Sequence, residues 1–212
     1  MVRDAVLRTA PHHEVIKIRE LIMPSILLTA PAVEPVTLDE ARSFLRVESN
    51  DDDEVIAALS TGARIHVEAQ TRRALITQGW RLTRDAWPED GRVAVRPGPL
   101  QALTAARVYD FDNNAQTLDV QGFVPDLGAS ALVFAPWALP APGRIGLGIE
   151  LDVTVGYGDA AIDVPEPLRQ AIRLLTAHWY ENRGLVATGT TQVGLLPQTV
   201  TALLAPYRMV SL

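Results

Sequence analysis

The pattern of hydrophobic and polar residues along the chain changes its period twice. From Pro35 to Arg73 the apolar residues recur every three or four positions, which predicts two helices joined by an acidic turn. From Ile76 to about Gly158 they alternate with polar residues in short runs bounded by turn residues, which predicts β-strands. Helical spacing returns from Pro165 to Asn182, and Leu195 to Leu204 predicts a short final helix. These elements predict an α+β fold, mainly helical, with a small antiparallel sheet or sandwich inserted between a helix pair and C-terminal helices.

The same pattern divides the chain into five segments. We expect an extended or partly disordered leader (1–34) followed by the helix pair (35–75) and the β insertion (76–160). The C-terminal helices (161–205) should pack on the helix pair, and a tail (206–212) follows. The leader's apolar run LIMPSILL weakly resembles a signal peptide, but Glu14 and Glu20 occupy the region that should be basic. An alternative hypothesis is that Met23 is the true start. No stretch approaches the roughly 20 apolar residues of a membrane span, so no membrane partner is expected.

Two helix starts carry strong local signals. Thr37 and Glu40 have the spacing of a capping box, in which the side chain of each residue accepts from the backbone N–H of the other. The next helix opens on Asp51, Asp52 and Asp53, whose charge suits a helix N-terminus. Apolar residues behind these two starts and along the later helix fall on one face and are expected to be buried: Leu38, Ala41, Phe44, Leu45, Val55, Ile56, Leu59, Ala63, His66, Val67, Leu168, Ala171, Ile172, Leu175 and Trp179.

Among the strands, Ile149 to Val155 has the cleanest alternation, and it ends in GYG. We interpret GYG as a turn, because the GK[ST] of a phosphate-binding loop does not follow it. Other short runs predict strands at Arg92–Arg96, Leu103–Phe111, Gln116–Val120 and Ala131–Phe134. The apolar loop from Pro136 to Pro142 contains Trp137, and it either forms an interface with a partner or folds back on the sheet.

Composition narrows the function classes. The net charge is −6, which argues against binding nucleic acid through overall charge. The chain has no cysteine, so disulfides, thiolate metal sites and cysteine nucleophiles are excluded. Consecutive aspartates point about 100° apart on a helix and cannot converge on one ion. The histidines, including His66 and His178, lie outside any known catalytic motif. We therefore expect no catalytic residue, no cofactor and no metal.

Several segments, taken in order, resemble the head–tail connector (adaptor) proteins of long-tailed phages and phage-like particles. The resemblance rests on TLDEARSFLRV, DDDEVIAALSTGARIHVEAQTRRAL, ITQGWRL, RPGPLQAL with ARVYD, VTVGYGD, VPEPLRQAIRLLTAHWYENR and LLPQTVTALLAPYR. It covers about Pro35 to Arg208. The alanine- and arginine-rich composition suits the adaptor of a gene transfer agent, which is a domesticated phage-like particle.

This resemblance implies a structural protein and not an enzyme. It implies a ring of about twelve copies at the head–tail junction of a particle assembled in the host cytoplasm, between the portal protein and the tail stopper or terminator, with a channel through which DNA passes without specific binding. The portal-side residues implied are Ala205, Pro206, Tyr207, Arg208, Met209, Val210, Ser211 and Leu212. Pro136, Trp137 and Leu139 are a candidate subunit or tail interface.

Two alternatives stay open at this point. One is a small α+β hydrolase that uses aspartate and histidine, although no nucleophile motif supports it. The other is a β-rich module that binds carbohydrate or peptide on a host surface, for which the scattered tryptophans give slight support. The sequence does not distinguish a monomer from a ring.

Overall fold

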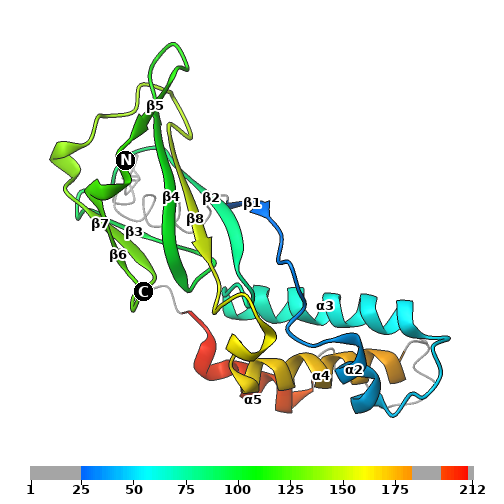
Figure 1. Ribbon diagram of the computed structural model, residues 1–212. Helices are drawn as coiled ribbons and strands as arrows, with labels where there is room; N and C mark the ends of the chain where they lie inside the picture. The colour runs from blue at the N-terminus through cyan, green and yellow to red at the C-terminus, as the bar shows by residue number, and fades with distance from the viewer. Residues whose placement is uncertain (1–24, 183–196, 210–212) are drawn as a thin grey trace, which may run out of the picture.

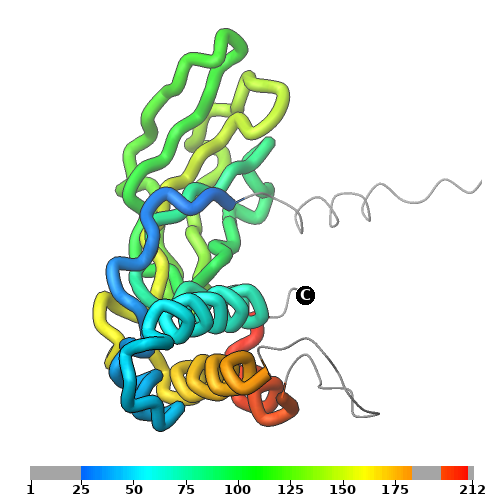
Figure 2. The backbone as a smooth tube through the Cα atoms, turned by 90° about the vertical axis from the view of Figure 1, so that its right-hand side faces the viewer, coloured from blue at the N-terminus to red at the C-terminus, as the bar shows by residue number. Residues whose placement is uncertain are grey.

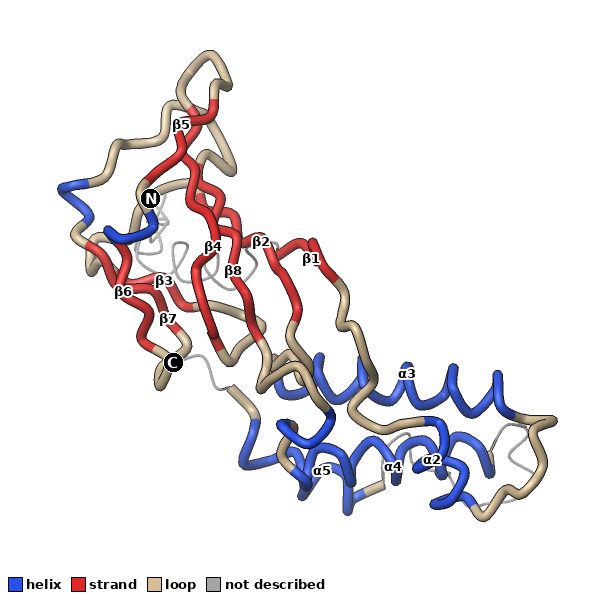
Figure 3. Tube along the Cα trace, in the orientation of Figure 1, coloured by secondary structure: helices blue, strands red, loops and turns tan. Residues whose placement is uncertain are grey.

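The computed structural model describes residues 25–182 and 197–209 (Figure 1). The α-helices and the strands occupy opposite ends of the molecule, and short 3₁₀ helices lie among the strands (Figure 3). In chain order the elements are β1 (Ser25–Thr29), α2 (Leu38–Leu45), α3 (Asp53–Thr71), β2 (Gln78–Arg84), β3 (Arg92–Ala94), β4 (Leu100–Tyr109), β5 (Ala115–Leu118), η1 (Val120–Gly122), β6 (Phe123–Asp126), β7 (Ala131–Phe134), η2 (Pro136–Ala138), β8 (Ile149–Val155), η3 (Ala161–Asp163), α4 (Glu166–Glu181), α5 (Gln198–Leu204) and η4 (Ala205–Tyr207).

The strands form two antiparallel sheets that enclose one hydrophobic core. The larger sheet has the order β1-β2-β8-β4-β5, and the smaller has the order β3-β7-β6. Alternation along β8 determines its two faces, since successive side chains point to opposite sides. Ile149, Leu151 and Val153 are buried in the core, whereas Glu150 lies on the outer face. The smaller sheet closes the core with an aromatic cluster in which the rings of Trp87, Phe123 and Phe134 lie 5.1–5.9 Å apart.

The helices enclose a second core. The long helices α3 and α4 run alongside each other, with α2 on one side of the pair and α5 on the other (Figure 2). Their facing stripes are fully buried, as periodic apolar residues on amphipathic helices should be. The helical core combines the two ends of the chain, and its fully buried members include Ile56, Val67, Leu168, Ile172, Leu175 and Leu204.

A short junction connects the two cores. Glu68, near the end of α3, accepts from Leu75 N (2.9 Å), from Gln78 Nε2 (2.8 Å) and from Arg64 Nη1 (2.8 Å). Burial raises the pKa of the Glu68 carboxyl above its ordinary value, although these donors oppose the shift. On the other side of the junction, Tyr157 N donates to Leu75 O at 3.1 Å. The sheets are therefore fixed to the helices by hydrogen bonds as well as by the chain.

The α+β class predicted from the sequence is confirmed. The capping box of Thr37 and Glu40 is present, and the predicted bounds of β7 and β8 are correct. The strand β1 lies inside the segment assigned to the leader, and β6 had no counterpart in the prediction. None of the helices in the described parts of the chain is long and apolar enough to cross a membrane. The signal-peptide and Met23 hypotheses concern residues 1–24, which lie outside the described residues.

Candidate assembly surfaces

The C-terminal segment predicted to contact the portal lies against the end of α3. Met209 N donates to Thr71 O at 3.2 Å, and Arg73 Nε donates to Tyr207 O at 2.8 Å. Arg208 Nη2 donates a hydrogen bond to Gln70 Oε1 at 3.2 Å. The Tyr207 ring is half-buried against the helical core, whereas Ala205, Pro206 and Arg208 are exposed. Val210, Ser211 and Leu212 lie outside the described residues.

The proline-rich loop presents one residue to solvent and anchors the others. Trp137, in η2, is 87% exposed, whereas Pro136 is half-buried and Leu139 packs against the sheet core. Trp87 Nε1 donates to Pro140 O at 2.9 Å, which fixes the loop to the sheet. η2 lies on the side of the sheets that faces away from the helices (Figures 1 and 3). Of the three predicted residues, Trp137 alone offers a large free apolar surface.

Two more exposed apolar residues lie near the β4–β5 turn, and the sequence analysis did not single them out. Phe111 is 89% exposed, and Ile145 is fully exposed. The loop that carries Ile145 is held to the turn, because Gly143 N and Arg144 N donate to Tyr109 O at 2.9 and 3.3 Å. A Cβ on Gly143 would lie 2.5 Å from Phe111 N, so this close approach requires glycine. The only sequence signal is an isolated apolar residue between turn residues, as in DFDNN and GRIGLG.

The outer face of the larger sheet carries a compact charge network. Arg81 Nε and Nη2 donate to the two oxygens of Asp152 at 2.6 and 2.9 Å, and Arg107 Nη1 donates to Asp152 Oδ2 at 2.8 Å. Burial by itself raises the pKa of Asp152, but the two arginines outweigh it and hold this pKa below its ordinary value of 3.8. Glu150 lies 3.2 Å from Arg81, so two acids and two bases balance on this face.

The acidic run at the start of α3 links helices and has no ligand geometry. Asp52 precedes α3, but its side chain makes no capping hydrogen bond and accepts from the hydroxyl of Tyr180 in α4 instead. Asp53 lies 3.4 Å from Arg42 of α2. The Asp52 side chain therefore bonds to α4 and not to a backbone N–H of α3, and the acidic charges lie at the positive end of the helix dipole, as expected. Within the described residues no group of three or more histidine, aspartate or glutamate side chains is arranged to hold a metal ion.

The remaining polar candidates also have structural surroundings. His66 packs edge-on against Trp179, with ring centroids 6.0 Å apart, as expected for an interface or core imidazole. A hollow beside the β4–β5 turn, lined in part by Tyr109, Asp110 and Asn114, has a volume of about 140 Å³. That volume is below the roughly 300 Å³ at which ligand pockets usually begin.

No protein-family model matches the chain, and no curated protein matches it. Chains of several solved structures do match it. A chain described as the neck of an empty gene transfer agent particle computed with C6 symmetry has a TM-score of 0.74 and 28% identity, and the match covers 90% of this chain and 97% of that chain. A chain from the virion of a native gene transfer agent particle has a TM-score of 0.73, with the same identity and coverage. A chain from the neck of a native particle computed with C12 symmetry has a TM-score of 0.68 and 26% identity, covering 88% of this chain and 97% of that chain.

The fold and these comparisons define a structural protein of a phage-like particle, a component of its head–tail junction. More particularly, the chain is of the neck type found in gene transfer agent particles, and the resemblance inferred from its sequence is confirmed.

Proposed function

We propose that the chain is the head–tail adaptor of its particle. In this proposal about twelve copies form a ring between the portal protein and the tail stopper or terminator. DNA passes through the axis of the ring, and the protein carries out no catalysis. The observation that carries the proposal is the likeness to neck chains over 90% of this chain and 97% of theirs.

The symmetry of the related assemblies supports the ring. Two of the similar chains come from neck structures computed with C6 and C12 symmetry. Cyclic assemblies use heterologous contacts, in which one face of a subunit meets a different face of the next. A net charge of −6 suits a channel that must release its cargo, because few phosphate contacts would form.

The exposed surfaces suggest which ends meet which partners. We assign the C-terminal segment, Ala205 to Leu212, to the portal, because it follows α5, lies against the end of α3 and exposes Ala205, Pro206 and Arg208. We assign Trp137 to the tail component, because η2 projects from the opposite side of the sheets (Figure 1). Leu139 packs against the sheet core and fixes the position of the loop that carries Trp137. An exposed tryptophan is a typical anchor at the centre of a protein interface.

Truncation after Arg208 tests the portal assignment. Removing Met209 to Leu212 deletes one backbone hydrogen bond to Thr71, which costs about 1 kcal/mol, and leaves the core contact of Tyr207 intact. We expect the truncated chain to fold and to lose binding to the portal ring. Native mass spectrometry of portal mixed with each variant measures the bound copies. The matched control is Trp137→Ser, which should bind portal like the unaltered chain.

Two results of this experiment would contradict different parts of the proposal. If the truncated chain binds portal as well as the full chain does, the C-terminal assignment is wrong and the adaptor proposal stands. If the full chain itself never adds to portal, in mixtures or in particles, the adaptor proposal is wrong.

A further inference from the structure

The helix α3 has a second apolar face that the described part of the subunit covers only in part, where Trp179 lies beside Gly62. Val55, Ala58, Gly62 and Ile65 lie at spacings of three and four, so they form one stripe along the helix. Val55 is 38% exposed and Ile65 is 55% exposed. This stripe lies opposite the buried stripe of Ile56, Ala63 and Val67 that packs into the helical core.

The stripe itself carries no charged residue from Val55 to Ile65. The two charged residues that follow Glu54 in α3, Arg64 and Glu68, face another side of the helix and pair with each other at 2.8 Å. A surface helix normally carries its charges on the side away from the core, and a helix that is apolar on both sides is normally buried on both. Within residues 25–182 and 197–209, α3 is therefore only partly covered.

Gly62 also indicates that this side of α3 packs against another helix. Glycine in the middle of a helix costs about 1 kcal/mol relative to alanine. Within the described subunit, a Cβ at Gly62 would meet only the Trp179 ring at 3.6 Å, which is an ordinary contact. The fold of one subunit therefore does not require a glycine there. Ala58 and Gly62 lie one turn apart and lower the helix surface where another helix could pack closely.

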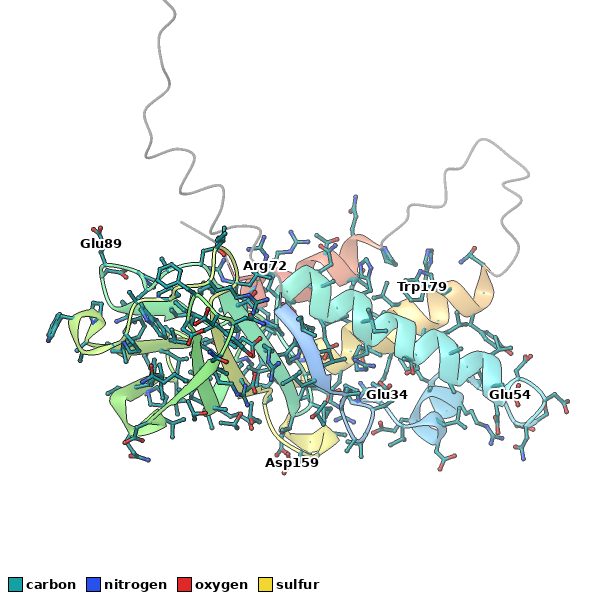
Figure 4. The ribbon with its side chains drawn as sticks, turned by 90° about the horizontal axis from the view of Figure 1, so that it is seen from above. Glu34, Glu54, Arg72, Glu89, Asp159 and Trp179 are labelled. Carbon is teal, nitrogen blue, oxygen red and sulfur yellow. The ribbon has the colours of Figure 1, made fainter. Side chains whose placement is uncertain are left out.

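Trp179 borders the stripe on one side, and α2 lies on the other side of α3 (Figure 4). Trp179 of α4 is half-buried and stands beside it, held edge-on by His66 at 6.0 Å. In Figure 4, Trp179 lies on one side of α3, whereas Glu34 and α2 lie on the other. On the α2 side another large apolar residue is exposed, since Phe44 is 39% exposed although its spacing predicted burial. The helical unit thus has uncovered apolar residues on two different sides.

We propose that the stripe of Val55, Ala58, Gly62 and Ile65 is the contact surface for a second copy of this chain, which meets it with the α2 side that carries Phe44. The proposal rests on the ring proposed above and names the surface that closes it. A ring needs two different faces on each subunit, and these two apolar sides meet that requirement. The symmetric necks from which the similar chains come favour a second copy over an unrelated partner.

A matched pair of substitutions tests the surface. Ala57 and Ala58 are both exposed and adjacent, but they point about 100° apart, so only Ala58 lies on the stripe. Ala58→Glu places an unpaired charge in the contact, and we expect the number of copies per particle to fall about tenfold or more. Ala57→Glu should leave that number unchanged. Circular dichroism and thermal unfolding of both purified variants should match the unaltered chain, since neither residue is buried.

Cross-linking identifies the occupant. A photoreactive benzoylphenylalanine at position 65, in particles, should give adducts whose masses are multiples of this chain, with peptides from α2 at the second site. The same group at position 57 should give none. Adducts with a different protein, no adduct at position 65, or equal incorporation of Ala58→Glu and Ala57→Glu would each overturn the proposal. If the unaltered chain is absent from the neck, the proposed function fails instead; if it forms the neck ring without these adducts, only this contact fails.

Discussion

At the scale of single residues, arginine joins elements that are distant in the sequence. Arg169 of α4 is 9% exposed, and it donates to Pro35 O at 2.9 Å and to Glu40 at 2.7 Å. Arg64 connects α3 to Glu34 at 2.8 Å. A planar guanidinium can donate in several directions from a fixed frame, so one side chain satisfies several acceptors at once. These contacts fix the helix pair to α4 and to the chain that leads out of β1.

Asp152 should make the free energy of unfolding depend on pH in the acid range. Its folded-state pKa is lowered by Arg81 and Arg107, so its contribution is present above the unfolded pKa and is lost as the pH falls through the folded pKa. We expect Asp152→Asn to lower the free energy of unfolding by about 2–3 kcal/mol at pH 7, because charged hydrogen bonds are lost. As the pH falls below the ordinary pKa of 3.8, the difference in unfolding free energy between variant and unaltered chain should narrow, and it should vanish only below the folded-state pKa. Urea unfolding at pH 7 and pH 3 measures both values, and a gap that stays constant with pH would contradict this account.

At the scale of elements, long and strongly patterned segments were predictable. The capping box of Thr37 and the alternation of β8 act through residues close in sequence, so both were found. The strand β1 was assigned to a leader because its residues continue the apolar run LIMPSILL, which resembles a signal peptide, and show no alternation. The hydrogen bond between Asp52 and Tyr180 was not predicted, because the two residues lie 128 positions apart. Local pattern cannot reveal such a contact.

The candidate surfaces were predictable only in part. The sequence identified Trp137 as an exposed apolar candidate, and it grouped Phe44 and Val55 with the core because their spacing is that of core residues. Periodicity shows that a residue faces something apolar, but it does not show whether that surface belongs to the same subunit or to a neighbour. Phe111 was placed at the end of a predicted strand, but β4 ends at Tyr109, and Ile145 lies in a loop with no periodic signal.

Gly156, the residue after β8, should be hard to replace by any other residue. Gly156 has φ +132°, and a Cβ there would lie 2.7 Å from the carbonyl of Ile76. We expect Gly156→Ala to destabilise the protein by at least about 2 kcal/mol, because strain and a backbone clash add. Gly122→Ala is the matched control, since a Cβ there meets nothing within 4 Å. Thermal unfolding compares them, and equal melting temperatures would refute the role assigned to Gly156.

At the scale of the whole molecule, the two cores keep apart surfaces that we assign to different partners. η2, which contains Trp137, lies at the sheet end of the molecule, whereas α3 with its exposed stripe and the C-terminal segment lie at the helical end (Figure 1). The junction of Glu68, Leu75 and Tyr157 holds these surfaces in one arrangement. A subunit built in this way can contact several neighbours without any of them competing for one site.

Trp137→Ser tests the tail side of this arrangement. The side chain is 87% exposed, so the free energy of unfolding should change by no more than about 0.5 kcal/mol. If Trp137 anchors the tail component, losing it should cost about 2 kcal/mol of binding, and tailed particles should become rarer. Counting tailed and tailless particles by negative-stain microscopy measures this. Ile162→Ser, at a similarly exposed residue of the helical unit, is the control, and equal tail counts for both variants would count against the assignment.

The composition of the helical core has a consequence for synthesis on the ribosome. Ile56 and Val67 come from the first third of the chain, whereas Leu175 and Leu204 come from its end. The segment from β2 to β8 is continuous, so the sheets can fold while the C-terminal helices are still being translated. The helical core closes only when α5 has left the ribosome. A prematurely terminated chain would therefore display folded sheets without a completed helical unit, and it could not take a place in the neck.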